Sequence, residues 1–191
     1  MFAWQVGIFD PKITAILDLI ARSEGTEFAP LTHMHGYDVI VTGELMDSNG
    51  AYHVHEETFD DFSTHPFAVT KLRPEGRHPV LVRVHPPLES TASGRYQQLL
   101  HNWTVYRVQL HLPDFGCLSQ DKMGVQLLKE IRAIEPIMDG DIKATLPLLG
   151  LRWASFPSSK AGQPRHSVET LLAWHQEIIV GPQAASNAMT A

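Results

Sequence analysis

The sequence predicts an α+β fold that is mostly helical, with a small antiparallel sheet inserted after the first helix. A helical apolar period runs through residues 11–24, short β-branched runs separated by turn residues fill 36–88, and helical periods return after Pro87. With 191 residues, 43% of them hydrophobic, the chain can bury one sizeable core. We therefore expect a single domain over residues 1–181 and a flexible tail over 182–191, which is small and polar.

The helices are predicted from their periodicity and their capping residues. Asp10 can cap the first helix, Pro11 suits its first position, and Gly25 can end it. Later helices are expected over residues 93–110, 121–134, 142–149 and 168–179, with caps at Thr91 or Ser90, Ser119, Asp141 and Ser167 respectively.

The sheet is predicted from three short runs rich in β-branched residues. These runs are 37–42, 67–72 and 80–85, and the turn-rich segments 47–50 and 73–76 separate them. Short strands with close turns favour antiparallel pairing.

Composition excludes several classes of protein. The net charge is −6, so no basic surface is expected that could neutralise a nucleic-acid backbone. Cys117 is the only cysteine, so no internal disulfide can form. The N-terminus has no positively charged region before its short apolar run, so we expect no signal peptide, and no apolar stretch is long enough for membrane insertion.

Glu24 is the first candidate for chemistry. On a helical wheel it falls on the same narrow face as Ile13, Leu17 and Ile20, at the C-terminal end of the first helix. Partial burial and the negative end of the helix dipole both favour a protonated carboxyl group, which is what a general acid needs. The alternative is that the helix frays there and Glu24 reaches water, or pairs with an arginine such as Arg95.

Several motifs occur together in an order that resembles the bacteriophage lambda lysozyme (endolysin) family. The resemblance covers about residues 13–179 and is carried by ILDLIARSEGTE, HGYDVIVTGEL, FSTHP, STASGRYQQLL and WASFP. It implies a lysozyme-like fold with two lobes around a glycan cleft. Members of this family are lytic transglycosylases, and the resemblance places the single catalytic glutamate in SEGT, at Glu24.

The resemblance also suggests substrate-binding residues. Gln97 would hydrogen-bond a sugar or orient Glu24, and Arg95 or Tyr96 would contact substrate. Tyr37 could pack against a sugar face, and Asp38 is the nearest second carboxylate of the motifs. Each also has a structural interpretation: Tyr37 and Tyr96 as core aromatics, Asp38 as a turn residue and Arg95 as half of a surface ion pair.

Other activities remain open at this point. Glu24 and Asp38 together could make a hydrolytic muramidase. His33 with His35, and His53 with His55 and Glu56, have spacings that zinc sites sometimes use, as in a cell-wall peptidase or amidase, although no HExxH motif occurs. We expect no metal and no cofactor. A noncatalytic wall-binding protein with the same fold is a further alternative.

The family resemblance implies a cellular context as well. The protein would be a monomer made in the host cytoplasm and released to the periplasm by a separate holin-type pore, where it would act on peptidoglycan strands. Segments 47–58 and 73–87 are longer than the usual connections, which predicts an enlarged lip on the sheet side of the cleft. The net charge of −6 is unusual for an enzyme that acts on an anionic polymer.

Overall fold

The computed structural model describes residues 9–41, 43–46, 52–55, 57–71, 74–82, 88–162 and 164–181. In chain order the elements are α2 (Pro11–Ser23), β1 (Gly43–Met46), β2 (Tyr52–His55), β3 (Val80–Val82), β4 (Leu88–Ser90), α3 (Leu100–Gln109), α4 (Cys117–Glu130), α5 (Ile134–Asp139), α6 (Ile142–Leu149) and α7 (Val168–Val180). The fold is therefore mostly helical with one small sheet after the first helix, as predicted. The tail expected at 182–191 lies outside the described residues.

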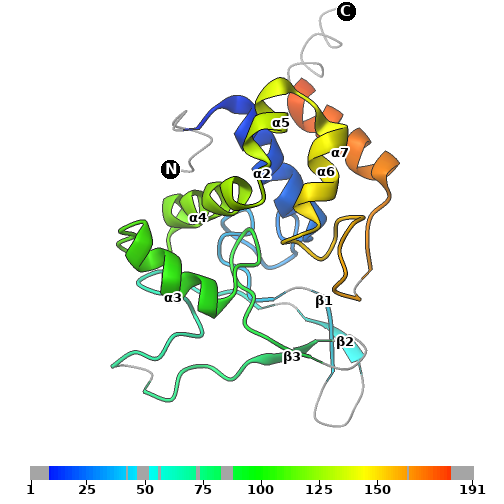
Figure 1. Cartoon of the computed structure of the whole chain (residues 1–191). Helices are drawn as coiled ribbons and strands as arrows, with labels where there is room; N and C mark the ends of the chain where they lie inside the picture. Colours follow the sequence, from blue (N-terminus) through cyan, green and yellow to red (C-terminus); the bar gives the residue numbers. More distant parts are fainter. Residues whose placement is uncertain are drawn as a thin grey trace, which may run out of the picture.

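The elements are arranged as a helical end and a sheet end. Figure 1 shows α5, α6 and α7 gathered around α2 at one end of the molecule, with the sheet at the other. Helix α2 packs against α4, α5 and α7, so its buried face forms the centre of the core. The core includes the fully buried side chains of Leu19, Ile20, Phe115, Met123, Leu128, Leu149, Phe156 and Leu171. None of the helices in the described ranges has the length and apolar content needed to span a bilayer.

The sheet is antiparallel throughout, with the strand order β2-β1-β3-β4. In β1, Leu45 pairs with His53 of β2 on one side and with Val82 of β3 on the other. Only the third predicted strand coincides with an observed one, since β3 covers the first three residues of 80–85. The long segments 47–58 and 73–87 contain β2 and β3, and much of the rest of them lies outside the described residues.

The prediction of a strand over 37–42 is wrong. Val39 forms an isolated bridge with Thr58 and Ile40 one with Ser93, and no ladder develops. The physical reason is burial on both faces: residues 37–41 are all buried, so the segment crosses the core instead of lying on a half-exposed sheet.

The prediction of a strand over 67–72 is also wrong for its described part, residues 67–71. The N–H of Ala68 donates to the carbonyl of His65 at 2.8 Å, which closes a turn directly after Pro66. This turn takes the place of a strand ladder. Val69, one of the two β-branched residues there, is largely exposed.

Helices α2, α6 and α7 were predicted correctly because their caps are local. The Asp10 carboxylate accepts the Lys12 N–H at 2.8 Å, Asp141 accepts that of Ala144 at 3.0 Å, and Ser167 accepts that of Thr170 at 3.1 Å. Each contact lies within three residues, so the sequence shows it directly.

The helix predicted over 93–110 begins only at Leu100. Ser93 and Gln98 exchange two backbone hydrogen bonds of 3.0 and 2.9 Å, and both Gly94 and Gln97 have positive φ. This tight turn stops helix formation in GRYQ. The predicted cap Thr91 still serves α3, because its hydroxyl accepts the N–H of Leu100 at 3.1 Å.

The helix predicted over 121–134 is two helices. Helix α4 begins at Cys117, so Ser119 lies inside it instead of capping it. The Asp114 carboxylate takes the N-terminal role, accepting the Gly116 N–H at 2.8 Å and the Ser119 hydroxyl at 3.2 Å. Arg132, with φ of 58°, separates α4 from α5.

Candidate active site

Glu24 lies at the C-terminal end of α2, directly after the last helical residue. Its side chain is half-buried, and its Oε1 atom accepts a hydrogen bond of 2.6 Å from the hydroxyl of Ser155. Burial raises the pKa of the Glu24 carboxyl above its ordinary value of 4.5, and the hydrogen bonds from the side chain and backbone of Ser155 partly oppose this. The group therefore has the character that the helical wheel predicted for a general acid.

Three motif segments, one of which carries Glu24, are joined by two hydrogen bonds. The hydroxyl of Thr26, two residues after Glu24, donates to the carbonyl of Arg95 at 2.6 Å. The indole Nε1 of Trp153 donates to the carbonyl of Tyr96 at 3.1 Å. SEGT, GRYQ and WASFP, which are far apart in the sequence, are thereby fastened together by side-chain hydrogen bonds to backbone carbonyls.

Arg95 forms a buried ion-pair cluster. Its guanidinium group lies 2.8 Å from Asp18 and 3.5 Å from Glu27, and also donates to the carbonyl of His35. The side chain is only 2% exposed, so it has almost no surface with which to contact a glycan. Its observed contacts hold GRYQ against α2 and the segment around residue 35.

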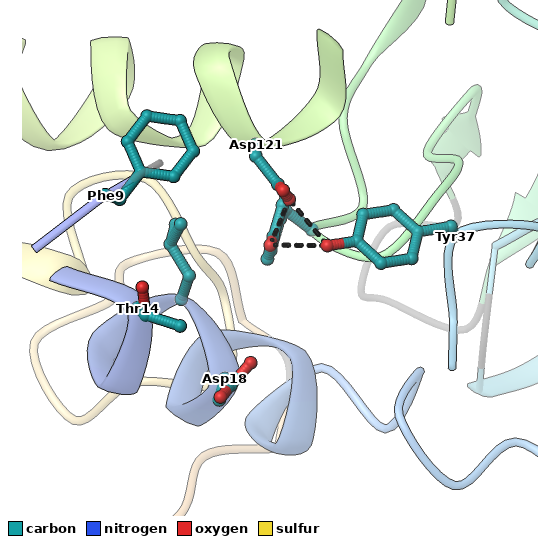
Figure 2. Close-up of a pocket in the computed structure, with 7 residues that line it drawn as sticks. Phe9, Thr14, Asp18, Tyr37 and Asp121 are labelled. Carbon is teal, nitrogen blue, oxygen red and sulfur yellow. Dashed lines mark hydrogen bonds between the residues drawn. The ribbon is translucent and has the colours of Figure 1, made fainter. Parts of the chain in front are cut away.

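Tyr37 and Tyr96 are buried and share one acceptor. Their hydroxyls donate to Oδ1 of Asp121 at 2.7 and 2.6 Å, and their rings make an edge-to-face contact. Figure 2 shows the Tyr37 hydroxyl and the Asp121 carboxyl pointing toward one another beside a small pocket that Asp18 also lines. Burial raises the pKa of Asp121, and both tyrosine hydrogen bonds oppose that rise. These contacts fit the interpretation of the two tyrosines as core aromatics.

Asp38 is buried in the turn before the sheet. Its carboxylate accepts hydrogen bonds from the hydroxyl of Thr32 and, at 2.9 Å, from the N–H of His33. The same Thr32 hydroxyl accepts the N–H of Gly36 at 2.8 Å. Asp38 thus organises the turn over 32–38, which fits its structural interpretation.

Gln97 is half-buried within the turn of GRYQ. Its Nε2 donates to the carbonyl of Gly94 at 3.2 Å, and its φ is 50°. Its position one turn inside a helix, which the sequence predicted, is wrong because that helix begins at Leu100. Its role toward a sugar or toward Glu24 stays a prediction.

The histidine pairs do not form a recognisable metal centre in the part of the chain that the structure describes. There, no group of three or more His, Cys, Asp and Glu side chains is placed to hold a metal ion. His33 and His35 are both exposed. Glu56, the third member of the other candidate group, lies outside the described residues.

Sequence reasoning missed several residues that shape the site. Ser155 contacts Glu24 from 131 residues away, and Gln120 and Asp121 hold the segments around Tyr37 and Tyr96 from helix α4. Ser155 lies in the WASFP motif, which marked the segment but not the contact with Glu24. For Gln120 and Asp121 the sequence offered no signal beyond their position in a predicted helix.

A mostly helical fold with one small sheet, and a half-buried glutamate at the end of the first helix, is typical of the class of lysozyme-like proteins. Two solved structures of bacteriophage lambda lysozyme confirm the fold. One, complexed with a chitohexasaccharide, matches with a TM-score of 0.68 and 36% identity, and the other with 0.65 and 34%; each match covers 89% of this chain and 95% of the other.

The Endolysin family model matches residues 14–180, and the chain belongs to this family. The endolysin of Escherichia phage P2 is 46% identical over 161 residues, which cover 84% of this chain and 88% of the relative. The endolysin of Escherichia phage lambda is 39% identical over 164 residues, covering 85% and 88%. The chain is accordingly a phage-type, peptidoglycan-degrading glycosidase.

Proposed function

We propose that this endolysin is a lytic transglycosylase. It cleaves the β-1,4 bond between N-acetylmuramic acid and N-acetylglucosamine and leaves 1,6-anhydro-muramic ends. The observation that carries the proposal is the half-buried Glu24, whose pKa is raised by burial and whose Oε1 accepts the hydroxyl of Ser155 in WASFP. The family membership and the resemblance in these motifs support it, as does the glycan bound in the related lambda lysozyme structure.

The reaction needs one carboxyl group in two successive roles. Protonated Glu24 gives its proton to the glycosidic oxygen as the bond from C1 of the muramic residue breaks. The 6-hydroxyl of the same sugar then attacks C1, and the ionised Glu24 accepts the hydroxyl proton. The carboxyl group ends in its starting form and no water is consumed. Because the 6-hydroxyl is already tethered to the reacting sugar, it has the advantage of proximity.

The second candidate is hydrolysis by Glu24 together with Asp38. A hydrolytic pair would require the second carboxylate to hold water or stabilise charge beside the sugar. Asp38 is instead buried and accepts hydrogen bonds from Thr32 and His33, which favours the transglycosylase.

Product analysis with two variants tests the proposal. Muropeptides released by the wild type should weigh one water less than hydrolysis products and should resist borohydride, because they lack a reducing end. Glu24→Gln should lose at least about a thousandfold in turnover, since it keeps the shape and loses the transferable proton. Asp38→Asn is the matched control and should retain most of the activity.

Each alternative function predicts a different result in these experiments. Reducing ends sensitive to borohydride, with equal losses in both variants, would establish the hydrolase. Inactivation by EDTA that added zinc reverses would favour a zinc peptidase or amidase. Failure of the wild type to clear permeabilised Gram-negative cells would indicate a noncatalytic wall-binding protein.

The cellular context belongs to the same proposal. The protein acts as a monomer in the periplasm after a separate holin-type pore releases it from the host cytoplasm. Measurement of lysis with and without a coexpressed pore tests this: lysis without the pore contradicts it.

A further inference from the structure

A short chain of hydroxyl groups lies behind Glu24. The Ser155 hydroxyl oxygen is 2.6 Å from Oε1 of Glu24 and 2.9 Å from the hydroxyl oxygen of Ser23. The Ser23 hydroxyl in turn lies 3.0 Å from the carbonyl of Ile20. Both serines are buried, so these contacts are shielded from water.

The hydrogen bonds among these hydroxyl groups can run in either of two directions, because each hydroxyl carries one proton. Ser155 can donate either to Glu24 or to Ser23, not to both at once. When Ser155 donates to Glu24, Ser23 can turn its own proton toward Ser155. This leaves no carbonyl unpaired, because the N–H of Glu24 also donates to Ile20, at 2.9 Å.

We propose that Ser155, supported by Ser23, is a positioning residue that donates to Oε1 of Glu24 throughout the reaction. This inference rests on the proposed function. The ionised carboxylate keeps the same bond to Ser155, so it does not have to move before it accepts the proton of the 6-hydroxyl. Both serines keep their own protons, and the chain itself gains or loses none.

The backbone around Ser155 is fixed independently of its hydroxyl. Its carbonyl accepts the N–H of His166 at 2.9 Å, and its own N–H also bonds to Glu24. The ring Nε2 of His166 lies 3.0 Å from the carbonyl of Ser23. Because a carbonyl only accepts, this nitrogen carries a proton whether the ring is neutral or charged. Removal of the Ser155 hydroxyl therefore takes away one contact to Glu24 and leaves the framework in place.

The charged groups on the neighbouring elements have partners of their own. On α2, Arg22 lies 2.7 Å from Glu177 of α7, and Asp18 pairs with Arg95. Glu27, in the loop after α2, also pairs with Arg95. Burial raises the pKa of Glu24, and the two hydrogen bonds from Ser155 lower it. A shift of this pKa in a Ser155 variant thus reports the lost hydroxyl.

The test is the pH dependence of kcat in Ser155→Ala. The alkaline limb reports loss of the proton from Glu24, and it should move to higher pH because the ionised form has lost a donor. The kcat at the optimum should fall about tenfold, with KM little changed, because the carboxyl is less well oriented. Ser159→Ala is the control. It removes another buried hydroxyl of the same loop, which accepts the N–H of Ala161, and it should behave as the wild type.

A matched pair covers the case in which Ser155→Ala folds poorly. Ser155→Thr and Ser155→Val have the same shape and differ in the hydroxyl alone. We expect the threonine variant to keep the wild-type pH limb and the valine variant to show the shift. An alkaline limb at the same pH in the threonine and valine variants would overturn the inference.

A direct titration separates this inference from the proposed function. Carbon-13 NMR of glutamate-labelled protein follows the Glu24 carboxyl, which is assigned by its absence in Glu24→Gln. Its midpoint should be higher in Ser155→Ala than in the wild type even if the enzyme proves to be a hydrolase. An unchanged midpoint overturns the positioning role, whereas reducing ends in the digest overturn only the transglycosylase.

Discussion

At the scale of single residues, the burial that suits Glu24 to acid catalysis also lowers the stability of the folded protein once the carboxyl group ionises. Its carboxyl group is half-buried at the end of α2, and burial makes ionisation costly in the folded chain. The folded pKa is raised above 4.5, so the folded state binds the proton more tightly than the unfolded state does. The stability that this group contributes is fully present below pH 4.5 and is lost as the pH rises through the folded pKa.

Glu24→Gln should therefore stabilise the protein in a pH-dependent way. The amide cannot ionise, so the variant escapes the loss that the wild type suffers above pH 4.5. Urea unfolding at a series of pH values should give equal free energies of unfolding, apart from a constant offset, below pH 4.5 and a growing advantage for the variant above it. A difference that stays constant from pH 4 to pH 8 would show that burial does not perturb Glu24.

Glu24 could be predicted from the sequence and Ser155 could not. The apolar period of α2 and the SEGT motif are each contained in a short stretch of consecutive residues, so they can be read from the sequence. Ser155 reaches Glu24 only because the chain between them folds, and the sequence spacing carries no trace of that contact. For the same reason the burial of Arg95 by Asp18 was not foreseen, although an ion pair was.

At the scale of elements, the contact between GRYQ and helix α4 depends on a glycine. Gly94 has φ of 77°, and a Cβ atom there would overlap the side-chain amide of Gln120. That amide accepts the N–H of Arg95 and donates to the carbonyls of Tyr37 and Phe115, each at 2.9 Å. One glutamine thus joins α4 to two of the motif segments.

Gly94→Ala should cost far more stability than a glycine replacement in open space. Gly140 is the matched control, because its φ is 75° and no atom lies within 4 Å of a Cβ placed there. We expect Gly140→Ala to lower the free energy of unfolding by about 1 kcal/mol, the cost of the left-handed backbone alone. Gly94→Ala should lower it by roughly 3 kcal/mol, because the hydrogen bonds of Gln120 are also displaced. Equal losses in chemical denaturation would contradict this role of Gln120.

The helices were more predictable than the strands for a physical reason. Helix caps such as Asp141 and Ser167 bond to N–H groups three residues away, so composition and position suffice. Strands pair with distant segments, and a β-branched run buried on both faces, as at 37–41, looks like a strand without forming a ladder. The turn in GRYQ was missed because a positive φ at Gln97 is uncommon outside glycine.

At the scale of the whole molecule, the net charge of the protein opposes binding of the substrate. The chain carries a net charge of −6, and peptidoglycan is anionic, so long-range forces repel the two. Binding must then rest on short-range hydrogen bonds and packing, which salt affects little.

Added salt should tighten binding of anionic fragments. Raising the ionic strength from about 0.01 M to about 0.15 M shortens the Debye length from roughly 30 Å to roughly 8 Å and screens the repulsion. With Glu24→Gln, whose lost turnover keeps the glycan intact, the Kd for peptidoglycan fragments should fall about twofold. The Kd for uncharged chitin-type oligomers is the control and should not change. Weaker binding of the anionic fragments in salt would reveal a local basic surface and contradict the expectation.

The long separation between Glu24 and Ser155 also has a consequence for the timing of synthesis. A ribosome that adds about 5–20 residues per second needs on the order of ten seconds to advance the 131 positions from Glu24 to Ser155. During that interval the nascent chain contains its carboxyl group but neither the serine nor the tryptophan of WASFP that complete its surroundings. The site is therefore assembled only near the end of translation. A chain that stops before Ser155 is expected to have no activity.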